Sequence, residues 1–351
     1  MIDPFSQDRQ MWPMPSTPRP IAIVGAGGIV SGGHLPAYRQ YDLPVAGIYD
    51  IDGERAREVA DRFDVPKVYD TLADLLAEDA VFDIALPPAV LADVLPQLPS
   101  GAVALIQKPL GEDGKAARAL ADVLAERGVT ASVNFQLRFT PAMVAITNAI
   151  RDGVFGELVD IDVNLHCKTP WEDWPFMATM NHIELPLHSI HYLDWIRAHA
   201  GMPHGVFARS VPHPDYPDRA DARSSIILDY DRDLKCCLSL SHVHKGGTER
   251  ERGEFRVEGT KAAAIVDMGY LRNQPAGEDE HLWVNTGDGW REVPLAGQRM
   301  VDSFAAVMAN LQRFAAGEDD DLPTDIPGSV ATMELVDACI RSSDTRQVVT
   351  L

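Results

Sequence analysis

The chain has 351 residues, of which 46% are hydrophobic, and its formal net charge at pH 7 is −21. This length favours more than one domain, and the hydrophobic fraction is sufficient for a buried core. The negative charge argues against binding to nucleic acid or to an anionic membrane surface, because both require clustered lysine and arginine. No apolar run approaches the roughly 18 residues expected of a membrane span.

The four cysteines, at positions 167, 236, 237 and 339, match no spacing that is typical of a zinc or redox motif. We therefore expect reduced, packed thiols and a cytoplasmic protein. Residues 1–19 form a proline-rich arm that lacks the basic start and apolar run of a secretory signal.

Residues 20–138 alternate short apolar segments with longer helical patterns. Strands are predicted at "IAIVGA" (21–26), "VAGIYD" (45–50), "FDIALP" (82–87), "AVALIQ" (102–107) and "VTASVNF" (129–135). Helical patterns such as "GERAREVADRF" separate them. Strands that alternate with helices in this way predict βαβ units in a doubly wound parallel sheet, that is, an α/β domain.

The pattern changes in residues 139–351. A helix is predicted at "PAMVAITNAIRDG", and two more near 301–315 and 327–341. Strands are predicted at 158–168, 224–230, 234–244, 254–260 and 262–268. This succession of strands with short turns predicts an α+β domain, in which an antiparallel sheet has helices on one face.

The segment "IAIVGAGGIVSGGH" leads from a strand into a glycine-rich turn. Gly25 and Gly27 occupy the first two positions of a G-x-G-x-x-G pattern, and Val30 occupies the third. The first glycine lets the chain turn, and the second lets the backbone approach a pyrophosphate. A structural glycine turn would share this pattern, but the second strand ends in Asp50, whose carboxylate can bind ribose hydroxyls. Asp52 rather than an arginine stands beside it, so we predict NAD in preference to NADP.

The segment "LPLHSIHYLDWIR" (185–197) is predicted to be a helix that begins just after Pro186, with His188 and His191 on one face. Two such histidines can be a buried pair, half of a metal site, or a catalytic base with a helper. The ligand-type side chains of "HIELPLHSIH" lack the spacing of a standard metal motif, so we predict no metal site.

Four motifs together resemble the Gfo/Idh/MocA family of sugar and cyclitol oxidoreductases. They are "GAGGIVSGGHLPA", "IQKPLG", "NFQLRFTPAM" and "HSIHYLDWIR", and the resemblance covers nearly all of the chain after the arm. It implies an N-terminal Rossmann domain over 20–138 and a C-terminal domain over 139–351 with a large open antiparallel sheet. In the family that sheet often forms the subunit interface, which implies a homodimer or homotetramer.

The resemblance also implies roles for single residues. Lys108 would be the active-site lysine of the family and His191 its histidine acid/base. The family usually has an aspartate four residues before that histidine, where this chain has Leu187. We therefore predict His188 as a helper in a rebuilt site. Glu184 could act on His191 if the helix extends that far, and Asp194 is either a residue that orients His191 or a surface charge.

The chemistry of an alcohol oxidation fits these side chains. An imidazole can take the hydroxyl proton, and a lysine ammonium can polarise the substrate oxygen. Aromatic rings next to a carboxylate suit the faces and hydroxyls of a sugar, although a packed aromatic loop would have the same composition. The predicted substrate contacts are Trp171, Glu172, Trp174, His188 and His242. The predicted cofactor contacts are Gly25, Gly27, Gly28, Ile29, Asp50, Pro87 and Lys108.

The sequence thus predicts an NAD-dependent oxidoreductase that acts on a hydroxyl of a sugar, sugar acid or cyclitol. Two alternatives stay open. One is an enzyme that retains its cofactor and uses transient oxidation to cleave a glycoside or to act as a lyase. The other is a non-catalytic NAD-binding sensor. Net formation of NADH separates the first function from both alternatives.

Overall fold

The computed structural model describes residues 3–169, 177, 180, 182–216, 221–273, 277–297 and 299–351. The chain forms two compact units, which we call the parallel-sheet unit and the nine-strand unit. The parallel-sheet unit holds residues 12–139 and 300–333, and the nine-strand unit holds residues 1–11, 140–299 and 334–351. The division falls one residue from the predicted boundary at 138, but it assigns residues 300–333 to the first unit and divides the N-terminal arm.

The parallel-sheet unit contains a five-stranded sheet in the order β2-β1-β3-β4-β5, and every neighbouring pair is parallel. Its strands are β1 (Ile21–Val24), β2 (Val45–Tyr49), β3 (Val81–Ile84), β4 (Val103–Ile106) and β5 (Thr130–Val133). Every residue of β1, β3 and β4 is buried, as expected for a sheet that is covered on both faces. The predicted doubly wound α/β sheet is confirmed.

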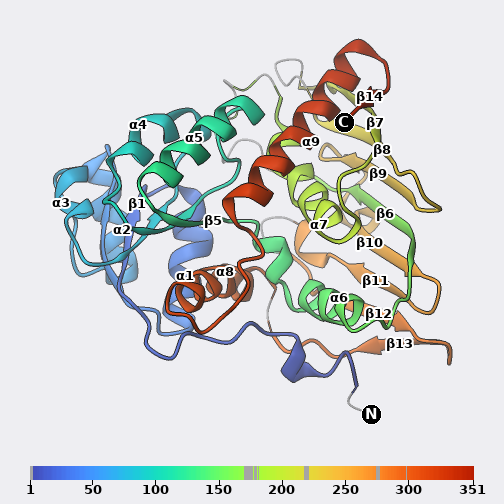
Figure 1. Cartoon of the computed structure of the whole chain (residues 1–351), viewed down its shortest axis with the longest axis horizontal. Coiled ribbons are helices and arrows are strands. Elements are labelled where there is room, and N and C mark those ends of the chain that lie inside the picture. The colour runs from blue at the N-terminus through green and yellow to red at the C-terminus, as the bar shows by residue number, and fades with distance from the viewer. Residues whose placement is uncertain are drawn as a thin grey trace. The chain divides into compact units, whose positions relative to one another are not determined.

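Helices cover both sides of this sheet: Figure 1 shows α4 and α5 on one side and α1 and α8 on the other. Asp52 and Asp113 begin α2 and α5 as N-caps, each accepting a backbone N–H three residues ahead. The helix α8 adds Phe304 and Leu311 to the core of this unit. The bounds are α1 Leu35–Gln40, α2 Gly53–Phe63, α3 Leu72–Leu76, α4 Leu91–Val94, α5 Gly114–Glu126 and α8 Arg299–Ala315.

The nine-strand unit contains one sheet in the order β13-β12-β11-β10-β6-β9-β8-β7-β14. All neighbouring pairs are antiparallel except β6 and β9, which are parallel, so the sheet is mostly antiparallel as predicted. Its strands are β6 Leu158–His166, β7 Gly205–Val211, β8 Arg223–Asp229, β9 Lys235–Ser241, β10 Arg252–Gly259, β11 Ala263–Asp267, β12 His281–Asn285, β13 Trp290–Val293 and β14 Val349–Thr350. The sequence pattern singled out neither β7 nor β12, β13 and β14.

Helices lie on one face of this sheet, where Figure 1 shows α6 (Pro141–Arg151) and α7 (Ile190–Ala200) side by side. The helix α9 (Ile326–Thr345) hydrogen-bonds β7 through the hydroxyls of Ser342 and Ser343. Along β8 and β9 buried residues alternate with more exposed ones, so one face is packed and the other is open.

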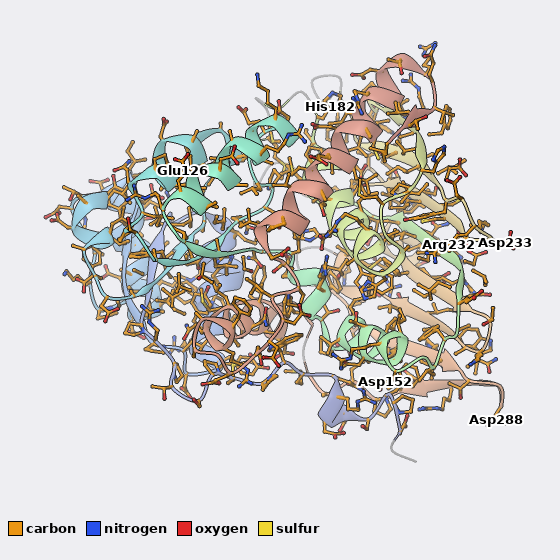
Figure 2. All side chains as sticks on the ribbon, in the orientation of Figure 1. Glu126, Asp152, His182, Arg232, Asp233 and Asp288 are labelled. Carbon is orange, nitrogen blue, oxygen red and sulfur yellow. The ribbon has the colours of Figure 1, made fainter. Side chains whose placement is uncertain are left out.

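The open face of the nine-strand sheet carries exposed apolar side chains, including Phe207 (40%), Ile227 (50%) and Trp283 (40%). Charged turns border the sheet, and Figure 2 labels Arg232 and Asp233 between β8 and β9. None of the helices in the described part of the chain combines the length and the apolar character needed to cross a bilayer.

Candidate functional site

The glycine-rich turn after β1 has one glycine that the fold requires and one that it does not. Gly25 has φ +108°, and a Cβ there would lie 2.5 Å from the carbonyl oxygen of Ala85, so only glycine fits. A Cβ on Gly27 would have no atom within 4 Å. The backbone at Gly27 therefore borders open space, which a pyrophosphate can approach. Helical structure begins at Gly28, and its first N–H groups can hold an anion.

The third position of the glycine pattern holds Val30 where the motif has glycine. Val30 is fully buried and begins a π-helical turn, Val30–His34, that continues into α1. Close packing occurs instead at Gly33, where a Cβ would lie 2.6 Å from the ring of Phe304. The pattern therefore tolerates Val30 because Gly33 provides the close contact with α8.

A buried polar trio lies beneath this turn. Asp83 on β3 accepts a hydrogen bond from Tyr38 at 2.7 Å, and its Oδ2 lies 2.6 Å from Nδ1 of His34. All three side chains are almost completely buried. Sequence reasoning missed this trio, although one signal was present, because Asp83 interrupts an otherwise apolar strand segment.

Asp50 is held at the end of β2 by three hydrogen bonds. Its Oδ2 accepts a hydrogen bond from the backbone N–H of Ala26 at 2.7 Å. Its Oδ1 accepts one from the backbone N–H of Asp52 at 2.9 Å and one from the Arg55 guanidinium at 2.7 Å. This contact with Asp50 raises the pKa of Arg55. The expectation that no arginine stands beside Asp50 was wrong, because the first turn of α2 brings Arg55 back to it.

The other predicted cofactor residues follow the same edge of the parallel sheet. The turn Gly25–Gly28 follows β1, Pro87 lies three residues beyond the end of β3, and Lys108 lies two beyond the end of β4. Because parallel strands end at a common edge, this is where such sheets bind ligands. Pro87 and Gly28 are exposed, and Ile29 is half-buried.

Lys108 is half-buried after the strand β4. Its backbone N–H donates to Oε1 of the buried Gln107 at 2.8 Å. Burial lowers the pKa of Lys108 to about 8. Gln107 supplies an acceptor but no negative charge that would raise the pKa of Lys108 again.

The histidine-bearing helix begins earlier than predicted. The N–H of Leu187 already bonds to Ile183, so the helix starts at Glu184 and includes Pro186 in its first turn, where a missing N–H costs nothing. Asp221 caps it, because its Oδ1 accepts the N–H groups of Ile183 and Glu184. Residues Leu185–Ser189 form a π-helical turn that continues into α7. The predicted start after Pro186 was therefore wrong.

The residue that caps the helix has a further neighbour. His182, labelled in Figure 2, lies just before the helix with its Nδ1 3.4 Å from Oδ2 of Asp221. The hydrogen bond to Asp221 raises the pKa of His182. His182 therefore belongs to the helix start.

His188 and His191 are both half-buried on this helix. Asp194 is 1% exposed, and its Oδ1 lies 3.5 Å from Arg197. The interpretation of Asp194 as a surface charge was therefore wrong. Leu187 is buried in an apolar cluster with Met177, Ile183, Ala222 and Val243.

His188 and His242, which the sequence analysis grouped as substrate contacts, do meet in the structure. Their ring centroids are 4.3 Å apart. His242 is 1% exposed, and its Nε2 lies 3.6 Å from Oε1 of the fully buried Glu184. Sequence reasoning did not pair Glu184 with His242, since 58 positions separate them and only the sheet topology brings them together.

Trp171, Glu172 and Trp174 lie outside the described residues. A pocket of about 440 Å³ is lined by Lys168, Tyr216, His244, Lys245, Gly247, Thr248 and Glu251. Within the described ranges, no group of three or more histidine, cysteine, aspartate or glutamate side chains is arranged to hold a metal ion.

Comparison with family models assigns both units. Residues 19–135 match the model described as the oxidoreductase family with an NAD-binding Rossmann fold, and residues 143–265 match the GFO/IDH/MocA C-terminal domain. The chain belongs to the Gfo/Idh/MocA family. It is an oxidoreductase that uses NAD, and the turn at Gly25 and Gly27, with Asp50 beside it, fits that cofactor.

Individual relatives agree with this assignment. An uncharacterised oxidoreductase of Synechocystis is 26% identical over 275 residues, 72% of each chain. The D-apiose dehydrogenase of Paraburkholderia graminis is 34% identical over 139 residues, which are 38% of this chain and 37% of that protein. A levoglucosan dehydrogenase solved with NADH and levoglucosan shares the fold, with a TM-score of 0.79, 17% identity, and coverage of 95% of this chain and 99% of that one.

Proposed function

We propose that the protein is an NAD-dependent dehydrogenase that oxidises a hydroxyl group of a sugar, sugar acid or cyclitol. The observation that carries this proposal is the helix with two half-buried histidines, His188 and His191, in a chain of an NAD-using oxidoreductase family. The substrate class is supported by the names of relatives, which include a D-apiose dehydrogenase and a levoglucosan dehydrogenase.

Oxidation of a secondary alcohol removes a hydride, which NAD⁺ accepts when it is bound, and a proton. In our proposal His191 takes the proton, because an imidazole titrates near neutral pH. The Lys108 ammonium donates a hydrogen bond to the substrate oxygen, which stabilises the charge that develops there. His188 helps to hold His191 and the substrate.

Each predicted cofactor residue receives a role in the same proposal. Backbone groups of the segment Gly25–Ile29 hold the pyrophosphate, Asp50 accepts the ribose hydroxyls, and Pro87 and Lys108 border the nicotinamide. NAD is favoured over NADP because the Asp50 carboxylate would repel a 2′-phosphate. Arg55 is ion-paired with Asp50 and is therefore less available to bind a 2′-phosphate.

The test is a panel of sugars, sugar acids, cyclitols and glycosides with added NAD. NADH is followed by absorbance and the organic product by chromatography in the same samples. We expect NADH and oxidised product in equal amounts with one substrate class. We also expect His191→Asn to lose at least about 100-fold in kcat, the typical contribution of a general base, while NAD affinity is retained.

Two results would replace the proposal. Free sugar with no net NADH would indicate redox-assisted cleavage, or lyase chemistry, with a retained cofactor. The buried Leu187 favours this alternative, since it stands where the family usually has a carboxylate. NAD binding without turnover, and with no effect of Lys108→Ala on any reaction, would indicate a sensor.

We also infer a homodimer or homotetramer that is formed through the open face of the nine-strand sheet. Exposed Phe207, Ile227 and Trp283 on this face support the inference, because large apolar surfaces mark interaction sites. Light scattering after size exclusion should give a multiple of the 38.4 kDa chain mass. The substitution Ile227→Lys should lower that multiple, and a monomeric wild type would contradict the inference.

We place the protein in the cytoplasm. All four cysteines are free thiols in the structure, which agrees with a reducing compartment. Fractionation of the source cells with an antibody to the protein tests this location, and recovery in a secreted or periplasmic fraction would overturn it.

A further inference from the structure

The side chain of Glu184 is buried with few hydrogen-bond partners. Glu184 is 0% exposed, and its Oε1 accepts a hydrogen bond from the Ser189 hydroxyl at 2.6 Å. Its Oε2 accepts none from the described residues. An isolated carboxylate in such a place is strongly disfavoured unless a cation is next to it.

His242, at the end of β9, is the cation that the geometry offers. Its Nε2 lies 3.6 Å from Oε1 of Glu184, and its Nδ1 lies 2.8 Å from Oγ1 of Thr169. Burial by itself would lower the pKa of His242, but Cys167 and Glu184 outweigh burial and raise it to about 9. An imidazolium here can form an ion pair with Glu184 on its Nε2 side and donate a hydrogen bond to Thr169 from Nδ1.

The His188 ring packs against the His242 ring of this pair. Its ring centroid is 4.3 Å from that of His242, with 37° between the planes, and His188 is partly exposed while His242 is not. The His242 ring therefore neighbours both a fully buried carboxyl group and a half-buried imidazole. If His188 were protonated as well, its positive charge would lie at van der Waals distance from that of His242.

Other titratable groups of the described residues also face the pair. Cys167 lies at the end of β6, Tyr192 on α7 and Cys339 on α9, and burial raises the pKa of Tyr192 and Cys339. Asp221 accepts two backbone N–H groups at the helix start. His191 is one turn further along the same helix.

We propose that Glu184 and His242 form a buried ion pair that serves as a positioning device, fixing the His188 ring and keeping it neutral. In this proposal the pair acts as the charged partner of the active-site imidazoles. The catalytic consequence rests on the proposed function, whereas the state of the imidazoles does not.

The state of the imidazoles is tested first by NMR titration of the histidine ring protons in the full chain. The signals of His188 and His242 are assigned with His188→Asn and His242→Asn. We expect His242 to stay protonated to about pH 8 and His188 to be neutral well below that pH. In Glu184→Gln, His242 should lose its proton at least about one pH unit lower, a tenfold change in proton affinity, and His188 should titrate higher.

A matched control removes another glutamate from the same unit. Glu258 lies on β10, where it pairs with Arg256. In Glu258→Gln neither imidazole titration should move. The inference is overturned if wild-type His242 titrates near the ordinary histidine value, or if Glu184→Gln leaves it unchanged. Neither result depends on finding a substrate, so it is independent of whether the protein proves to be a dehydrogenase.

The positioning role is tested by the pH profile of kcat/KM with the substrate from the panel. In Glu184→Gln the acid limb should move up by about one unit, so kcat/KM falls about tenfold at pH values well below the wild-type limb and little at pH 8.5. In a His188→Asn background the same substitution should cause no shift, because the coupling passes through His188. An equal loss at every pH, or a shift that persists without His188, would refute the positioning role.

Discussion

The two glycines of the turn after β1 should separate a structural role from a binding role. In Gly25→Ala, the new Cβ would lie 2.5 Å from the Ala85 carbonyl oxygen, at a backbone φ of +108°. A side chain held in such a conformation costs about 1–3 kcal/mol, and the backbone displacement adds to it. We expect a loss of about 3 kcal/mol, which lowers Tm by roughly 6–12 °C at about 2–4 °C per kcal/mol.

Gly27→Ala should do the opposite. Its Cβ meets no atom within 4 Å, and Gly27 is not among the glycines with positive φ. We expect stability to stay within about 1 kcal/mol of wild type, with a small gain because alanine restricts the unfolded chain. The Cβ would however occupy the space that a pyrophosphate must enter, so the Kd for NAD should rise at least about tenfold, or about 1.4 kcal/mol.

Both variants are measured by thermal unfolding without NAD and by calorimetric titration with NAD. The reasoning is refuted if Gly27→Ala binds NAD as tightly as wild type, because the backbone at Gly27 would then not be the surface that the cofactor approaches. It is also refuted if Gly25→Ala unfolds at the wild-type temperature.

Further predictions concern the other polar residues of the parallel-sheet unit. Asp83→Ala should lower the free energy of unfolding by about 3–5 kcal/mol in chemical denaturation, because it leaves two buried partners without their acceptor. The control Asp79→Ala, at an exposed ion pair, should not change this free energy measurably. Turnover should fall as pH rises through about 8, because the Lys108 ammonium is then lost, and this limb should be absent from the pH–rate profile of Lys108→Met. Asp50→Ser should raise the Kd for NAD about tenfold and narrow the preference for NAD over NADP. The variant removes the repulsive carboxylate and releases Arg55. Titrations with both cofactors measure the two Kd values.

The sequence was sufficient for the features that local pattern determines. Five short apolar segments separated by amphipathic helices predicted the parallel sheet, because a strand covered on both faces is apolar throughout. The alternation in "LKCCLSLSHVH" likewise predicted a strand with one packed face, and Cys236 is buried while Cys237 is partly exposed.

Features that depend on distant contacts were not predictable from local pattern. The helix at Glu184 starts early because Asp221, 37 residues further along the chain, caps it. The parallel pairing of β6 with β9 brings Thr169 to His242, and no periodicity in either segment encodes that pairing. Arg55 reaches Asp50 only because the cap at Asp52 sets the first turn of α2.

A carboxylate would not be accommodated at position 187 of the histidine-bearing helix. Leu187 packs against Ile183, Ala222 and Val243, and a carboxylate in this apolar cluster would lose its hydration without gaining a partner. Glu184 is also buried, but the Ser189 hydroxyl and the His242 imidazole lie within reach of its oxygens. A helix that begins at Glu184 can therefore keep an apolar contact at Leu187 and still carry a carboxyl group one turn before His188. That carboxyl group lies 3.6 Å from the His242 imidazole, which follows the strand β9.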